Sequence, residues 1–226
     1  MTRALAAFAL CGCALAVAGA QTGKPAVAAP NLAGVYQAIP DTLTLPGGLK
    51  NAGGPNQIAL QPSARERMKT VDLKDDSAKL CLALGPFRMM ARDQVKFELV
   101  PAPGLLVMIY EDVAHGHMRN IHMSRTHPAK LAPSWLGDST GSWEQDTLVV
   151  DTVGFNDRTW LNEAGAPHSD ALHLVERIRS LRNGAVLEYR VTAEDPQALT
   201  VPYTYVRYFQ KTPQERAESF CDAVLE

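Results

Sequence analysis

The sequence predicts an all-β fold, an antiparallel meander that closes into a lipocalin-like barrel, with one short helix near residues 63–71. After residue 95 the chain is a series of short segments rich in β-branched and aromatic residues, separated by turn residues. No helical spacers lie between these segments, which favours antiparallel neighbours. Closing the meander into a barrel removes its exposed edges, so a barrel is favoured over an open sheet.

The expected strands follow one another along the chain. The first covers 33–37, and a loop rich in Pro, Gly and Asn follows at 40–62. Two tight turns support the later pairings: Gln145-Asp146, and Asn183-Gly184, which is a hairpin signal. The later strands are expected at 95–100, 105–111, 117–123, 143–144, 147–153, 172–181, 186–192 and 203–210.

The expected helix begins with a capping box. Ser63 and Glu66 have the spacing in which the serine hydroxyl and the glutamate carboxylate each satisfy a free backbone amide. We expect this helix to end near Val71.

The first 20 residues have the pattern of a secretory signal peptide. Arg3 gives a positive start, residues 4–18 are almost wholly apolar, and Ala18-Gly19-Ala20 matches a cleavage site. A membrane anchor is one alternative, but it would need about 20 strongly apolar residues. A lipoprotein processed at Cys11 is the second-ranked interpretation, after the signal peptide. The sequence thus predicts a periplasmic or secreted protein with a flexible lead-in at 21–32, a single domain at 33–226, and no membrane segment after cleavage.

Cleavage would leave two cysteines, Cys81 and Cys221. In an oxidising compartment a pair of cysteines is most simply a disulfide. A catalytic cysteine is the alternative, although nothing around either position favours a lowered thiol pKa.

Composition and motifs narrow the function. The formal net charge is −2 and no Lys/Arg cluster occurs, which argues against a nucleic-acid partner. The sequence contains no phosphate-binding loop, nucleophile elbow or linear zinc motif. We therefore expect neither an organic cofactor nor a metal.

Several distinctive motifs lie between residues 80 and 222: Pro133–Ser139 (PSWLGDS), Gly141-x-Trp143-Glu144, Asp146–Asp157 (DTLVVDTVGFND), Pro167–Ser169, Leu172-His173 and Glu176-Arg177. Together these motifs resemble a family of exported bacterial proteins. The resemblance implies an exported β-rich domain and supplies no reaction. Members usually carry Asp-Gly-Arg before His127-Pro128 and Gly where this chain has Gln145. A shorter match, at 31–36, is similar to the start of lipocalin-like barrels.

Alternation along the strands separates two sets of titratable residues. Glu111, Asp151 and Glu176 each share a face with apolar residues, whereas His173 and Arg177 occupy the opposite face of their strand. A carboxylate among apolar neighbours has a raised pKa suited to proton transfer. The alternative is a salt bridge to Arg119, Arg177 or Arg179 on an adjacent strand.

Two irregular segments, 127–138 and 154–169, are expected to roof a ligand cavity, because long loops in compact domains are often functional. His127 and His168 each lie beside a proline in these segments. Acid/base, metal-binding and purely structural roles all remain open for the histidines.

The first functional hypothesis is an exported enzyme, a cofactor-independent lyase, hydratase or isomerase acting on a small oxygenated molecule. The alternatives are a non-catalytic lipocalin-like carrier and a metal-dependent enzyme using His and carboxylate ligands. The catalytic candidates are Glu111, His127 and His168 for proton transfer, with Arg119 and Arg177 stabilising negative charge. The substrate-binding candidates are Trp135, Asp138, Asn156, Trp160 and His173.

Overall fold

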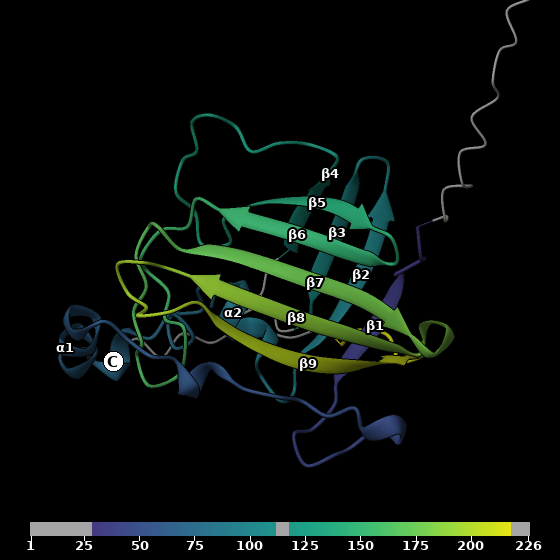
Figure 1. Ribbon diagram of the computed structural model, residues 1–226, viewed down its shortest axis with the longest axis horizontal. Helices are drawn as coiled ribbons and strands as arrows, with labels where there is room; N and C mark the ends of the chain where they lie inside the picture. The colour runs from purple at the N-terminus through teal and green to yellow at the C-terminus, as the bar shows by residue number, and fades with distance from the viewer. Residues whose placement is uncertain (1–28, 112–117, 218–226) are drawn as a thin grey trace, which may run out of the picture.

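In residues 29–111 and 118–217, which the computed structural model describes, nine strands form a closed barrel in sequential order (Figure 1). The predicted all-β barrel is therefore confirmed, and most strand positions agree within a few residues. The strands are β1 (Gly34–Ala38), β2 (Lys96–Ala102), β3 (Leu105–Tyr110), β4 (Met118–Met123), β5 (Asp138–Glu144), β6 (Thr147–Val153), β7 (His173–Leu181), β8 (Val186–Glu194) and β9 (Tyr203–Thr212).

One strand pair departs from the predicted antiparallel meander. β4 and β5 are parallel, with Ile121 opposite Ser139 and Met123 opposite Gly141. A parallel pair needs a connection that returns to the starting end of the barrel. Residues 124–137 make that return, so most of the segment expected to roof a cavity, 127–138, also leads the chain from the end of β4 to the start of β5.

Strand alternation sorts side chains between the barrel interior and the outer surface. On β6, Leu148, Val150 and Thr152 are buried, whereas the intervening residues, including Asp151, are partly exposed. On β7, Glu176 is among the inward-facing residues. The same wall therefore carries polar groups on both faces.

Aromatic side chains fill much of the barrel interior. Tyr36, Phe97, Tyr189, Tyr205 and Phe209 are each almost fully buried. The rings of Phe97 and Phe209 pack edge to face with centroids 5.0 Å apart, a favoured aromatic geometry. These side chains occupy space in which the sequence predicted a ligand cavity.

The expected helix is present but starts one residue earlier. α1 (Pro62–Lys69) has Gln61 as its N-cap, which makes no side-chain capping bond. Pro62 takes the first helical position, where its missing N–H costs nothing. The capping box at Ser63 was therefore wrong, because the proline sets the start of the helix.

A second short helix was not predicted. α2 (Pro86–Met90) follows Gly85, whose φ of 77° is a left-handed conformation, and all five of its residues are buried. Phe87 packs edge to face on Tyr205 with centroids 5.0 Å apart, and the Tyr205 hydroxyl donates to the Phe87 carbonyl. Figure 1 shows α2 behind the β7–β9 wall.

The loop predicted at 40–62 covers the outer face of β8 and β9. Ile39 packs there with Val186, Val206 and Tyr208 in a second apolar cluster. Ala52 exchanges two backbone hydrogen bonds with Val206. The short 3₁₀ turns are η1 (Pro46–Gly48), η2 (Pro55–Gln57), η3 (Leu73–Asp75) and η4 (Arg182–Gly184).

Candidate functional site

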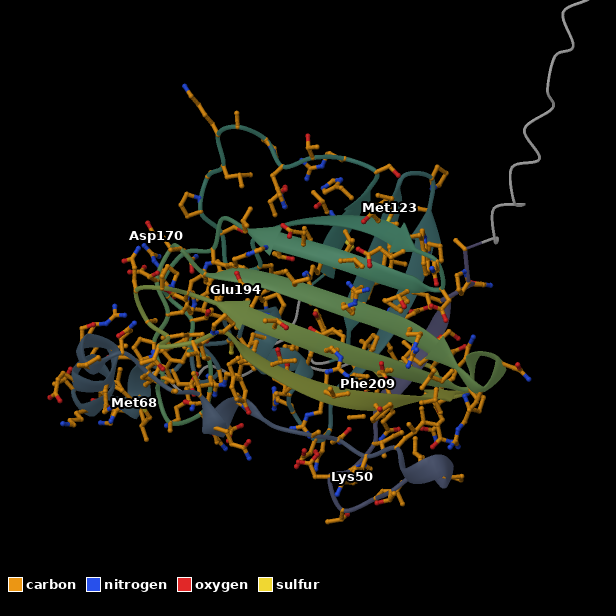
Figure 2. The ribbon with its side chains drawn as sticks, in the orientation of Figure 1. Lys50, Met68, Met123, Asp170, Glu194 and Phe209 are labelled. Atoms are coloured by element: carbon orange, nitrogen blue, oxygen red, sulfur yellow. The ribbon has the colours of Figure 1, made fainter. Side chains whose placement is uncertain are left out.

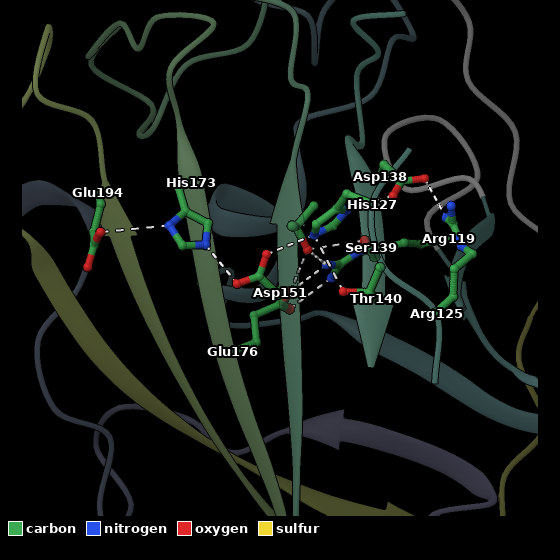
Figure 3. A network of polar contacts seen from close by, with 11 residues as sticks. Arg119, Arg125, His127, Asp138, Ser139, Thr140, Asp151, His173, Glu176 and Glu194 are labelled. Atoms are coloured by element: carbon green, nitrogen blue, oxygen red, sulfur yellow. Dashed lines mark hydrogen bonds and ion pairs between the residues drawn. The ribbon is translucent and has the colours of Figure 1, made fainter. Parts of the chain in front are cut away.

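An inner polar row crosses five neighbouring strands inside the barrel, from β4 to β8. Figure 3 shows Arg119, Ser139 and Glu176 of this row. Arg119 on β4 donates from Nη1 to Glu176 Oε1 at 2.8 Å and from Nη2 to the other carboxylate oxygen. Its guanidinium also donates to Ser139 Oγ at 3.0 Å and Thr152 Oγ1 at 2.7 Å. The Tyr189 hydroxyl donates to Glu176 Oε1 at 2.7 Å. Both ends of this buried ion pair are thus well supplied with partners.

Burial shapes the protonation of this row. Burial alone would lower the pKa of Arg119, but the Glu176 carboxylate raises it above its ordinary value. Burial raises the pKa of nearby Tyr110 to about 12 and places that of Tyr189 well above the ordinary value. At neutral pH the row holds a charged pair and neutral tyrosines, which suits a structural role.

This pairing confirms one of the two readings of Glu176. The residue shares its face with apolar neighbours, as predicted, and it forms the alternative salt bridge with Arg119, which lies across the barrel wall on β4 rather than on an adjacent strand. Arg119 was predicted to stabilise a substrate anion, but the residue is only 2 % exposed and its guanidinium is occupied by protein groups.

An outer row of charges lies on the opposite face of the same wall (Figure 3). Arg125 donates to Asp138 Oδ2 at 2.6 Å, and His127 Nδ1 is 2.7 Å from Asp138 Oδ1. The other ring nitrogen of His127, Nε2, is 2.8 Å from Asp151 Oδ1. A carboxylate oxygen can only accept, so the doubly protonated imidazolium is the form that satisfies both contacts.

The row continues through a second histidine. His173 Nε2 is 2.8 Å from Asp151 Oδ2, while its Nδ1 is 3.7 Å from Glu194 Oε2. The longer distance is beyond a hydrogen bond. A carboxylate therefore orients this imidazole, which is about one-third exposed (33 %) and has one nitrogen without a hydrogen bond in the described contacts.

The shifts in pKa follow from these contacts. Burial opposes charging of His127, but the hydrogen bonds to Asp138 and Asp151 raise its pKa above the ordinary value. Burial likewise opposes ionisation of both carboxyl groups, yet Arg125 and His127 lower the pKa of Asp138. His173 and His127 lower the pKa of Asp151.

A cleft of about 720 Å³ lies beyond the end of the barrel where β6 ends and β7 begins. The two segments predicted to roof a cavity build much of it, since Ser134 N donates to Gly154 O at 3.0 Å and Asn156 N to Ser134 O at 2.8 Å. In Figure 2, Asp170 of the cleft and Glu194 of the outer row lie at this same end. The lining residues include Arg67, Trp135, Asn156, Asp157, Arg158 and Asp170.

The structure brings together only part of the predicted site within the described residues. His127, Asp138 and His173 meet in the outer row. Trp135 and Asn156 line the cleft, and the side-chain Oδ1 of Asn156 accepts a hydrogen bond from the Arg158 backbone N–H at 3.2 Å.

The other candidates have separate partners. Glu111 pairs with Lys96 at 2.8 Å and accepts from the Ala217 N–H. Arg177 pairs with Glu144 at 2.6 Å on the exposed surface. Trp160 is half-buried and forms a backbone bridge with Pro167.

His168 is enclosed rather than presented to a cleft. It is 1 % exposed, and its Nδ1 lies 2.9 Å from the Ser169 carbonyl, which requires a hydrogen on Nδ1. Its Nε2 therefore accepts from the Thr159 hydroxyl at 2.7 Å. Burial lowers its pKa, so the residue is a neutral part of the loop structure.

Sequence reasoning missed Arg125, Asp151 and the serine and threonine of the inner row as site residues. The sequence signal for Asp151 was that it shares a strand face with apolar residues. Its partner histidines come from the 124–137 connection and from β7, which the sequence does not place beside it. Ser139 and Thr152 carried no signal, because alternation alone does not reveal a charged neighbour inside a barrel.

Some predictions fall outside the described residues. The signal peptide at 1–20 and Cys221 belong to the undescribed ends, so the Cys81–Cys221 pairing stays a prediction. Within residues 29–111 and 118–217, no helix combines the length and apolar character needed to cross a membrane. In the same ranges, no group of three or more His, Cys, Asp or Glu side chains is arranged to hold a metal ion.

Comparisons with known proteins gave neither a matching family model nor a matching curated protein. The resemblance to exported bacterial proteins therefore stays an expectation. Its motif residues Trp135, Asn156 and Ser169 do share one cleft.

Proposed function

We propose that the protein binds a small polar molecule in the cleft beyond the β6–β7 end of the barrel. The observation that carries the proposal is the lining itself. Two irregular segments that are distant in sequence meet there and contribute charged, amide and aromatic side chains to one hollow of about 720 Å³. Ligand sites commonly combine such a hollow with a few convergent polar groups.

The charges favour a ligand that carries both signs. Arg67 and Arg158 supply guanidinium groups, and Asp157 and Asp170 supply carboxylates. A guanidinium suits a carboxylate or phosphate group, and an aspartate suits an ammonium group. Trp135 offers an aromatic surface for the rest of the molecule. A zwitterion such as an amino acid meets all three features.

A carrier of a hydrophobic ligand is less well supported. A lipocalin-like carrier would hold its ligand within the barrel, where the aromatic residues and the Arg119–Glu176 pair are packed. The cleft is lined mainly by polar and charged residues, which do not suit a hydrophobic ligand.

Thermal melting tests the proposal with a panel of amino acids, dicarboxylates and monosaccharides at millimolar concentration. A ligand that binds the folded state raises the melting temperature, and we expect zwitterions to do so most. Arg158→Ala and Asp157→Asn should each weaken that ligand about tenfold, equivalent to about 1.4 kcal/mol. Arg190→Ala, an exposed arginine on β8, is the matched control. Unchanged affinity in both cleft variants would contradict the proposal.

A second candidate is an acid/base enzyme of the lyase, hydratase or isomerase class that acts on the cleft ligand. It is favoured by the Asp151–His173 pair, because a carboxylate-held imidazole with an open nitrogen is a common proton acceptor. His173 begins β7, three residues after Asp170 of the cleft.

Solvent deuterium uptake tests this candidate. A compound that binds should incorporate deuterium at carbon when incubated with the protein in heavy water, as followed by NMR. His173→Gln should slow uptake at least about 100-fold, whereas His122→Gln on β4 should not. Equal uptake in the two variants would exclude His173 as the proton acceptor.

We also propose that the chain is exported, on the strength of its N-terminal pattern. Mass spectrometry of the protein recovered from its native compartment should find an N-terminus near Gln21. A chain recovered in the cytoplasm with Met1 or Thr2 at its start would contradict export.

A further inference from the structure

The strap, residues 124–137, connects β4 to β5 and carries part of the cleft. Its central residues 128–130 are exposed, and Trp135 near its end lines the cleft. Its two ends are tied together, since Ser124 N donates to Gly141 O at 3.0 Å while Arg125 and His127 both contact Asp138. Loops closed in this way are compact surface units whose shape depends on the closing contacts.

His127 is the contact that joins the strap to the barrel wall at two points. Its ring lies between Asp138, the first residue of β5, and Asp151 on β6. Thr140 on β5 is 3.4 Å from its Nε2. Asp138 stands three residues after Trp135, so the position of its carboxylate bears directly on the cleft wall.

The charge of His127 decides whether both contacts survive. A protonated ring donates to both carboxylates, whereas a neutral ring has one N–H and one lone pair. In the neutral form the lone pair would face a carboxylate oxygen at under 3 Å, which is repulsive. Arg125 would still hold Asp138, and His173 would still hold Asp151.

We propose that protonated His127 clasps the strap against the barrel, and that loss of this proton loosens the strap and weakens binding in the cleft. The predicted effect on ligand binding rests on the proposed function. The clasp itself does not, because it can be observed without a ligand. The cleft is then open to control by pH.

The sign follows from the surrounding charges. The pKa of His127 is raised in the folded protein, so its stabilising contribution is complete below the ordinary histidine value of about 6.5 and is lost as pH rises through the raised value. Asp138 and Asp151 have lowered pKa values. Their contribution is complete above the ordinary aspartate range and is lost as pH falls through the lowered values.

The charged groups around the ring all belong to the outer row. Arg125 lies on the strap, Asp138 on β5, Asp151 on β6 and His173 on β7. Glu194 on β8 stands one step further, opposite His173. His173 is therefore the second imidazole in contact with Asp151, and a His173 variant is the control for His127.

The test follows the three tryptophan indole N–H signals by ¹H–¹⁵N NMR between pH 5 and 10, without ligand. Trp135→Phe assigns the Trp135 signal, and Trp143 and Trp160 serve as internal references. We expect the Trp135 signal to shift in one step whose midpoint coincides with the His127 imidazole titration, above pH 6.5. That step should disappear in His127→Gln and persist in His173→Gln.

A second variant keeps the test decisive if His127→Gln does not fold. Asp151→Asn removes one carboxylate, so the His127 midpoint and the Trp135 midpoint should fall together. A Trp135 signal that does not move while His127 titrates would overturn the proposal, as would an undiminished step in His127→Gln. If a cleft ligand is found, its affinity should fall across the same midpoint in the wild type and stay level in His127→Gln.

Discussion

Gln145 has a backbone φ of 58° in the turn between β5 and β6. This left-handed conformation costs a residue with a side chain roughly 1–2 kcal/mol, and glycine avoids that cost. The family that the sequence resembles usually has glycine here, and the turn geometry gives a physical reason for that choice. The residue is exposed, so nothing in its packing opposes a change.

Gln145→Gly should raise the free energy of unfolding by up to about 1 kcal/mol, because relief of the left-handed conformation outweighs the added freedom of glycine. Urea unfolding monitored by circular dichroism measures the change. Gln210→Gly is the matched control, since Gln210 lies in β9 and is exposed, and there glycine should cost about 0.5–1 kcal/mol. Equal losses in both variants would show that the turn is not strained.

At the residue scale, buried His168 makes the free energy of unfolding depend on pH. Burial lowers its pKa in the folded protein, whereas the unfolded chain has an ordinary value near 6.5. The unfolded state therefore binds more protons between these values, and stability is lost as pH falls from about 6.5 through the lowered value. The contribution is complete above the unfolded value.

His168→Gln should reduce the loss of melting temperature between pH 7.5 and pH 5, since glutamine does not titrate. The variant should also be less stable at both pH values, because two buried hydrogen bonds change. His122→Gln serves as the reference for general effects of losing a histidine. A full acid-induced loss in His168→Gln would assign that loss to other groups.

At the scale of elements, the inner row spans the β4–β5 pair, where the backbone ladder is short. β4 and β5 share a short parallel ladder, from Ile121–Ser139 to Met123–Gly141. Arg119 reaches across this seam from β4 to Ser139 on β5 and onward to Glu176 on β7. A side chain thus reinforces the barrel at its weakest backbone pairing.

Arg119→Met should cost about 3–5 kcal/mol of unfolding free energy, because it leaves the Glu176 carboxylate buried without its cation. The double variant Arg119→Met/Glu176→Leu should recover much of that loss, since apolar replacement of a buried pair is often neutral. Chemical denaturation of both variants gives the coupling energy. A double variant as unstable as the single one would mean that the hydroxyl partners, rather than the charge, carry the effect.

At the scale of the whole molecule, the outer row and the cleft lie towards the same end of the barrel, and α2 is buried against β9. Met123, at the end of β4, lies away from Asp170 and Glu194 in Figure 2. The long-range disulfide predicted between Cys81 and Cys221 would tie the segment before α2 to the C-terminal residues.

Cys81→Ser should lower stability by about 2–5 kcal/mol if that bond forms, since a disulfide closing a long loop restricts the unfolded chain. Thermal melting with and without reductant measures the loss, and non-reduced peptide mapping identifies the bonded pair. Cys221→Ser should match Cys81→Ser. An unchanged melting temperature in both variants would remove the disulfide.

The sequence by itself determined the barrel, because alternation and turn residues act locally and specify each strand from β1 to β9 with little reference to the rest of the chain. Parity also placed Glu176 and His173 on opposite faces of β7, but only the structure shows that Glu176 faces the interior. The start of α1 was misplaced because Pro62, rather than Ser63, dominates the first turn.

Only the tertiary structure decided the parallel β4–β5 seam, the filled interior and the grouping of the site residues. A strand pattern does not encode which end of the barrel the chain returns to, so residues 127–138 were predicted as a roof over a cavity and not as the return connection between two parallel strands. Likewise, Arg125 meets Asp138, and His127 and His173 both meet Asp151, only because the fold brings these segments together. Hydrogen bonds and ion pairs act over a few ångströms in space, and the distances that decide them are set by closure of the barrel rather than by position along the chain.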